Sequence, residues 1–160
     1  MLARRGWSLA VAGAFILAPL RSAQAQVFDA KVISLEGAKT MVASALAEAQ
    51  KNNWTVAIAI VDVTGGLILF QRMDEVQAGS LDIAIAKART AARFKRPTKA
   101  LADALAAGRL GLLSVEGIVV LEGGIPVTVN GKVVGAIGVS GMSSEQDATV
   151  AKAGADALKP

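Results

Sequence analysis

Histidine, cysteine and tyrosine are all absent from this chain of 160 residues. Without cysteine, no disulfide can stabilise the fold, and without histidine the commonest metal ligand and general base is missing. A catalytic triad built on histidine is therefore excluded, and no metal site is predicted. Of the side chains that most often ligate haem iron, only methionine remains.

Charge is also sparse, with 17 lysines and arginines against 13 acidic residues. Three of the basic residues lie in the first 25 positions, which hold no acidic residue. The rest of the chain thus carries 14 basic and 13 acidic residues, a net charge of +1. This balance gives no global basic signal for nucleic acid.

Residues 1–25 have the pattern of a cleavable signal peptide. Arg4 and Arg5 precede a mostly apolar run at 7–20, and residues 23–25 read Ala-Gln-Ala, a typical cleavage site. The alternative is a membrane anchor, but the run is shorter than the roughly 20 apolar residues that a spanning helix needs. The pattern predicts a periplasmic or secreted protein that starts at Gln26 and has no membrane span after cleavage.

Residues 26–160 fit a single domain, whose elements follow from the spacing of apolar residues. Helices are predicted at 35–52, 80–94, at 98–108 with Thr98 as its cap, and from Ser143 or Ser144 to 158, where Ser144 and Asp147 match a capping box. Strands are predicted at 55–62, 67–73, 117–121, 127–129 and 133–140, with a turn or bulge at 123–126. Hairpins between neighbouring strands indicate a largely antiparallel sheet and an α+β class.

Lys87 is out of place on the helix predicted at 80–94. It lies in the middle of an apolar stripe formed by Ile83, Thr90, Ala91 and Phe94. A buried ammonium is costly unless it is paired. Three interpretations remain open: a pocket for an anionic ligand, a subunit interface or solvent, or a carboxylate inside the fold such as Asp62, Asp74 or Glu122.

Other polar groups have both a structural and a functional interpretation. Arg89, Arg93 and Arg96 share a second face of this helix, which is either solvated or a surface for carboxylates, phosphates or haem propionates. The acidic residues near turns could supply a base, but turn positions explain them equally well. No catalytic constellation emerges, so an enzyme is not the favoured hypothesis.

Several short motifs occur together and in order, and their combination resembles the GlcG/HbpS-like "haem-degrading" domain family, related to the C-terminal domain of PduO-type proteins. The resemblance covers about residues 33–158. The motifs are Asn52-Asn53-Trp54, Arg72-Met73-Asp74, Lys87-Ala88-Arg89-Thr90-Ala91, Glu122-Gly123-Gly124-Ile125-Pro126, Gly138-Val139-Ser140-Gly141 and Gln146-Asp147.

The resemblance implies a profilin-like fold, in which helices flank both faces of a five-stranded antiparallel sheet, and it implies homo-oligomers. It also implies that haem is a possible cofactor. Carried over by motif, the candidate ligand-binding residues are Arg72, Met73, Asp74, Lys87, Thr90, Glu122, Gly123, Gly124 and Pro126.

The favoured hypothesis is an exported protein that binds haem or a related tetrapyrrole. The alternative is an enzyme or accessory subunit that acts on a small, glycolate-like carboxylate in a periplasmic oxidation system. Self-association is expected because the helix at 98–108 is apolar almost all round, and such a helix must be buried on every side.

Overall fold

The computed structural model describes residues 30–158. The predicted signal peptide, residues 1–25, and the first residues after it lie outside this range. The helices are α1 (Leu35–Lys51), α2 (Ala78–Phe94), α3 (Thr98–Ala106), the 3-10 helix η1 (Leu110–Ser114) and α4 (Ser144–Asp156). The strands are β1 (Ala57–Asp62), β2 (Leu67–Arg72), β3 (Gly124–Val129) and β4 (Lys132–Ser140).

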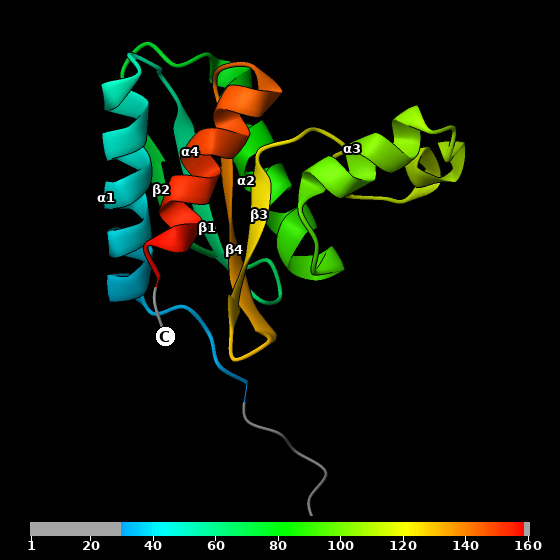
Figure 1. The fold of residues 1–160 in the computed structure, drawn as a ribbon, viewed down its shortest axis with the longest axis horizontal. Helices are drawn as coiled ribbons and strands as arrows, with labels where there is room; N and C mark the ends of the chain where they lie inside the picture. The colour runs from blue at the N-terminus through cyan, green and yellow to red at the C-terminus, as the bar shows by residue number, and fades with distance from the viewer. Residues whose placement is uncertain (1–29, 159–160) are drawn as a thin grey trace, which may run out of the picture.

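The strands form one antiparallel sheet in the order β2-β1-β4-β3 (Figure 1). Ala57 at the start of β1 pairs with Arg72 of β2 and with Ser140 of β4. Gly124 at the start of β3 pairs with Gly138. The end of β4 and the start of β3 therefore lie at the same end of the sheet, while β2 and β3 form its two opposite edges.

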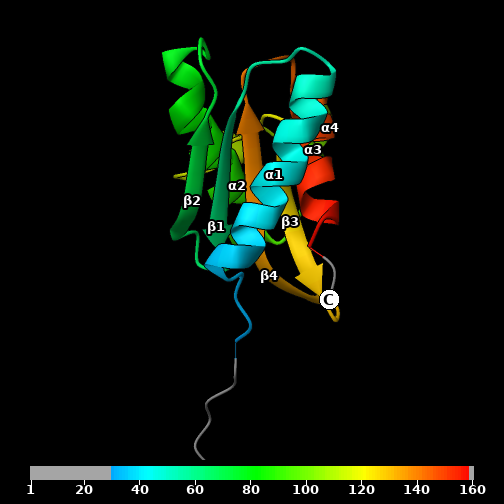
Figure 2. The same ribbon diagram turned by 90° about the vertical axis from the view of Figure 1, so that its left-hand side faces the viewer.

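Helices cover both faces of the sheet, as Figures 1 and 2 show from two sides. Helices α1 and α4 pack on one face, where Ile58 and Ile60 of β1 join a buried cluster that includes Met41. Helix α2 packs on the other face, against Ala57 and Ala59. The alternation of isoleucine and alanine along β1 is the two-residue period of a strand that is buried on both sides.

Helix α2 lies unusually close to the sheet, because the residues between them are small. A Cβ atom at Gly138 of β4 would lie 2.2 Å from the carbonyl oxygen of Ala84 and 2.4 Å from the nitrogen of Ala88. Only glycine leaves room for the helix backbone at this distance. The close approach sets the position of α2 and of the polar side chains that it carries.

The prediction of five strands is wrong, because the described residues contain four. Residues 117–121 were expected to form the extra strand, but they run beside α2 without sheet pairing. The backbone N–H of Val119 donates to the hydroxyl of Thr90, 3.0 Å away. A side chain of α2 thus takes the hydrogen bond that a neighbouring strand would have accepted.

The expected turn or bulge at 123–126 is also corrected, since Gly124, Ile125 and Pro126 belong to β3. Proline lacks the N–H that a central strand needs, but it is tolerated on an edge strand, and β3 is an edge of the sheet. Other boundaries differ little: α3 starts at Thr98 with Pro97 as its N-cap, and Ser34 caps α1 as predicted.

None of the helices within residues 30–158 is long and apolar enough to cross a membrane.

Substitution of Gly138 by alanine should destabilise the fold, because the added methyl would overlap backbone atoms that cannot move without shifting α2. We expect the free energy of unfolding to fall by about 1–3 kcal/mol or more. Gly79→Ala is the matched control: Gly79 lies near the start of α2, and an added Cβ there meets no atom within 4 Å. This change should stabilise by about 0.4–1 kcal/mol. Urea denaturation measures both, and equal stabilities would contradict the close packing of α2.

Candidate functional site

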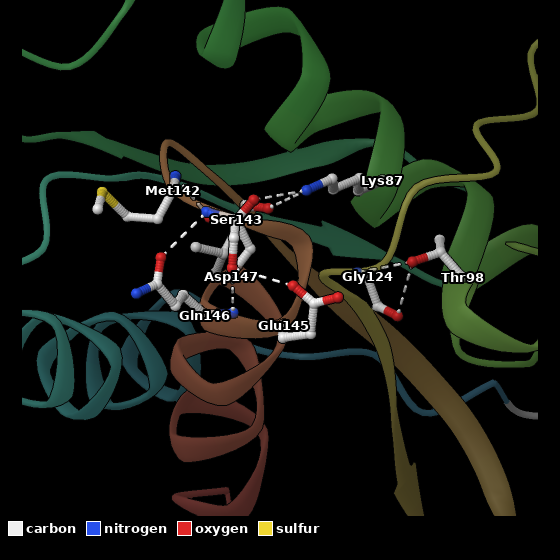
Figure 3. A network of polar contacts seen from close by, with 9 residues as sticks. Lys87, Thr98, Gly124, Met142, Ser143, Glu145, Gln146 and Asp147 are labelled. Atoms are coloured by element: carbon white, nitrogen blue, oxygen red, sulfur yellow. Dashed lines mark hydrogen bonds and ion pairs between the residues drawn. The ribbon is translucent and has the colours of Figure 1, made fainter.

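A buried ion pair joins α2 to α4. The Nζ atom of Lys87 lies 2.8 Å from the Oδ2 atom of Asp147, and both side chains are only 2% exposed. Nζ also donates to the carbonyl oxygen of Val139, 3.0 Å away. Because α2 and α4 cover opposite faces of the sheet, the pair connects the two layers past the ends of β3 and β4 (Figure 3).

The start of α4 turns Asp147 inward. Ser143 is the N-cap, and it forms a capping box with Gln146 rather than the predicted box of Ser144 with Asp147. Asp147 is therefore free of a capping role. Its Oδ1 atom accepts a hydrogen bond from the N–H of Met142 at 3.0 Å, and its other oxygen meets Lys87. The observed capping box begins one residue earlier than predicted. Asp147 is therefore a buried residue and not part of the cap.

Of the three interpretations of Lys87, pairing with a carboxylate inside the fold is confirmed, but the named candidates are wrong. Asp62 ends β1, and its Oδ1 atom accepts hydrogen bonds from the N–H groups of Thr64 and Gly66 in the turn that follows. A further hydrogen bond from the Thr64 hydroxyl is the main reason that the pKa of Asp62 is lowered. Asp74 is exposed beyond β2.

Burial raises the pKa of the Asp147 carboxyl above its ordinary value. The hydrogen bond and the charge of Lys87, with the N–H of Met142, oppose this shift because they favour the carboxylate. The carboxylate thus depends on the lysine for its charged form, and neither partner is tolerated without the other in so dry an environment.

Gly123 and Gly124 cover the ion pair. A Cβ atom at Gly123, whose φ is +121°, would lie 2.8 Å from Lys87 Nζ, and one at Gly124 would lie 2.4 Å from the Lys87 carbonyl oxygen. The hydroxyl of Thr98, at the start of α3, accepts a hydrogen bond from the N–H of Gly124 at 2.9 Å. The glycines therefore let the chain pass directly over the ammonium, and Thr98 holds them there.

A cleft of about 270 Å³ opens outside these glycines, between the starts of α3, β3 and α4. The walls of the cleft carry charges of both signs. Of its lysines, Lys99 pairs with Asp103 at 2.9 Å, and Lys152 pairs with Asp156 along α4. The pKa of Lys99 is raised, mainly by the hydrogen bond to Asp103. The cleft is lined by Pro97, Lys99, Glu122, Gly123, Gly124, Ile125, Glu145, Ala148, Thr149 and Lys152.

The structure brings only part of the candidate residues together. Glu122, Gly123 and Gly124 line the cleft, and Lys87 lies directly beneath them. Thr90 lies one turn further along α2, buried under Val119. Pro126 lies further along β3.

The motif at 72–74 lies elsewhere. Arg72 ends β2, and Met73 packs against the cluster under α1. Strands β1 and β4 separate β2 from β3. Within one chain, these residues are therefore on the opposite edge of the sheet from the cleft.

The basic face of α2 is partly structural. Arg89 donates from Nε to the carbonyl oxygen of Gly65 at 3.1 Å, and Arg93 donates to that of Thr64 at 2.9 Å. Both stabilise the turn between β1 and β2, while Arg89, Arg93 and Arg96 all remain exposed, as on a solvated face.

The polar groups on the walls of the cleft are the side chains of Lys99, Lys152, Glu122, Glu145 and Thr149. Among the described residues, no group of three or more Asp, Glu, His or Cys side chains could hold a metal ion. Sequence reasoning missed Asp147 and Thr98 under the cleft, and also the charged residues Lys99, Glu145 and Lys152 on its walls. Asp147 had a usable signal, since it follows the Ser143–Gln146 capping box; Thr98 had none, because its partner Gly124 is 26 residues away.

The fold and the cleft define a small α+β domain, with an antiparallel sheet between helices and a glycine-lined cleft over a buried ion pair. The family described as "Haem degrading protein HbpS-like" matches residues 33–156. The chain belongs to this HbpS-like family, as its motifs indicated.

Named relatives agree. Protein GlcG from Escherichia coli K12 is 42% identical over 109 residues, which are 68% of this chain and 81% of GlcG. The crystal structure of a double mutant of Streptomyces reticuli HbpS has a TM-score of 0.79 and 34% identity, covering 89% of this chain and 98% of HbpS. A crystal structure of a PduOC–haem complex has a TM-score of 0.73 and 28% identity, covering 79% of this chain and 95% of PduOC.

A double-mutant cycle tests the buried pair. Lys87→Met or Asp147→Asn alone should lower the free energy of unfolding by about 3–5 kcal/mol, because each leaves one buried charge unpaired. The double variant should lose less than the sum of the two by roughly 2 kcal/mol, since it buries no lone charge. The same cycle on the exposed pair Lys99–Asp103 should give a coupling below about 0.5 kcal/mol. A coupling as small at Lys87–Asp147, measured by urea denaturation, would contradict this view.

Proposed function

We propose that this protein is an exported, self-associating protein that binds haem or a related tetrapyrrole. The observation that carries the proposal is its membership of the HbpS-like family together with the solved PduOC–haem complex of similar fold. Export rests on the signal-peptide pattern of residues 1–25, and self-association on the apolar character of the region around α3.

The described residues fit the periphery of a tetrapyrrole better than its iron. Lys87 is bound to Asp147, and the Thr90 hydroxyl accepts the N–H of Val119, so neither faces a ligand. Among the methionines of residues 30–158, Met142 is the most accessible, 38% exposed beside the start of α4. Among the described residues, those that line the cleft include no methionine, and its lysines pair with acidic residues.

The surroundings of the cleft suit an amphipathic ligand with carboxylates at one end. Lys99 and Lys152 would meet propionate groups. The apolar stretch 118–121 leads directly into Glu122 of the cleft, and its Leu121 is 46% exposed. A flat macrocycle would pack on this stretch, and the cleft alone, at about 270 Å³, would hold only its polar end.

If packing and propionate contacts dominate, the iron should matter little. We expect hemin to bind the chain from Gln26 onwards with a change in its Soret band, and metal-free protoporphyrin IX to bind within about tenfold of the hemin Kd, a difference of roughly 1.4 kcal/mol. Met142→Leu should leave the hemin Kd unchanged.

The absence of any Soret change would overturn haem binding. Hemin affinity more than about a hundredfold above that of the metal-free ring, lost in Met142→Leu, would instead reveal an iron ligand and contradict the proposed mode of binding.

A small carboxylate is the second candidate, and the size of the cleft favours it. The volume of about 270 Å³ suits a short hydroxy acid better than a macrocycle, and two lysines lie on its walls. The negative charges of Glu122 and Glu145 in the cleft would oppose the binding of acids with more than one carboxylate. The pKa of Glu145 is lowered because its own backbone N–H and the Ser143 hydroxyl stabilise its carboxylate. Binding, rather than turnover, is what this arrangement supports.

Thermal unfolding in the presence of glycolate or lactate tests this candidate. At 100 times its Kd, a ligand should stabilise the protein by about 2.7 kcal/mol. The gain should fall in the Lys99→Gln/Lys152→Gln double variant and persist in Lys39→Gln, which removes an exposed lysine paired along α1 instead. A lack of stabilisation at millimolar acid, or an equal gain in all variants, would rule out the cleft as a carboxylate site.

A further inference from the structure

Glu122 is the acidic side chain of the cleft whose carboxylate is most available to a ligand. Its side chain is only 20% exposed, and its ion-pair partner among residues 30–158, the Nζ atom of Lys99, lies 4.0 Å away. No hydrogen bond joins the Glu122 carboxylate to another of the described residues, although a carboxylate can accept about four. The carboxylate of Glu145, in contrast, already accepts a hydrogen bond from the Ser143 hydroxyl at 3.0 Å.

The two lysines of the cleft each have an aspartate of their own. Lys99 donates to both carboxylate oxygens of Asp103, at 2.9 and 3.2 Å. Lys152 donates to a single oxygen of Asp156, so its ammonium keeps further N–H groups for a ligand. Once each lysine is paired in this way, the two glutamates of the cleft carry the charge that is not balanced.

The pKa of Lys99 responds to the same excess of negative charge. The hydrogen bond and the charge of Asp103 raise this pKa most, and the charges of Glu122 and Glu145 raise it further. An ammonium group is therefore favoured at this end of the cleft, and an anion is disfavoured. A cleft of this kind suits a ligand that brings a positive group of its own.

The apolar part of the cleft wall is small. It is formed by Pro97, Ile125 and Ala148, which lie among the charged residues. A volume of about 270 Å³ leaves room for a short aliphatic group beside them. In small-molecule sites, apolar side chains supply most of the contact surface and a few polar groups fix the orientation of the ligand.

We propose that the cleft binds a small aliphatic α-amino acid as its zwitterion, with the ammonium on Glu122 and the carboxylate on Lys152. Both contacts would be charge-assisted hydrogen bonds, which are stronger than neutral ones. The ligand has no net charge, so it adds nothing to the excess of negative charge in the cleft. This inference rests on the second candidate of the proposed function, a small carboxylate, and it names the group that distinguishes the ligand from a hydroxy acid.

L-Alanine and L-lactate test the inference, because alanine has an ammonium where lactate has a hydroxyl. Isothermal titration calorimetry on the chain from Gln26 onwards should give a Kd for alanine at least about tenfold below that for lactate, since a charged hydrogen bond replaces a neutral one. Glu122→Gln should remove this difference by weakening alanine alone. Lys152→Gln should weaken both ligands by a similar factor, because both carry the carboxylate.

Glu116→Gln is the matched control, an exposed glutamate outside the cleft whose change should leave both Kd values unaltered. Retained lactate binding in Glu122→Gln shows that this variant is folded. Lactate binding as tight as alanine binding, or an alanine preference that survives in Glu122→Gln, would overturn the zwitterion while the carboxylate site stands. A lack of binding of either acid at millimolar concentration would overturn the carboxylate site as well.

Discussion

The ion pair between Lys87 and Asp147 is the constraint on which the other features depend. It links helices on opposite faces of the sheet, and it does so where the sheet ends. An ammonium that is 2% exposed is stable only with a partner of opposite charge and an additional acceptor, here the carbonyl oxygen of Val139. The positions of α2, α4 and the end of β4 are therefore coupled through one nitrogen atom.

The cleft follows from this coupling. Residues 123 and 124 pass so close to Lys87 that neither position has room for a side chain. Gly123 and Gly124 meet this requirement. The N–H of Val139 donates to the carbonyl oxygen of Gly123, and the carbonyl oxygen of Val139 accepts from Lys87. Val139 therefore contacts both the lysine and the glycine that covers it. Gly123 and Gly124 therefore cover the ion pair on one side and line the cleft on the other.

Close packing and exposure divide the molecule into two parts. The sheet and its three long helices are held by small residues and by contacts such as that of Gly138 with α2. The arm formed by residues 98–117 carries large apolar residues that this core does not cover. Burial of apolar surface is the main stabilising term in folding, and the exposed leucines of the arm contribute little of it within this chain.

Local spacing along the sequence determined the helices, the two hairpins and the anomaly of Lys87, because each depends on residues within one or two turns of one another. It also placed the motifs by which the family is identified. The sequence did not reveal the partner of Lys87, 60 residues away, because a carboxylate in the first turn of a helix is usually a solvated or capping group. Nor did it reveal that residues 117–121 bond to Thr90 rather than to the sheet. Periodicity says which side of its own element a residue occupies; only the packing of elements against one another decides what that side meets.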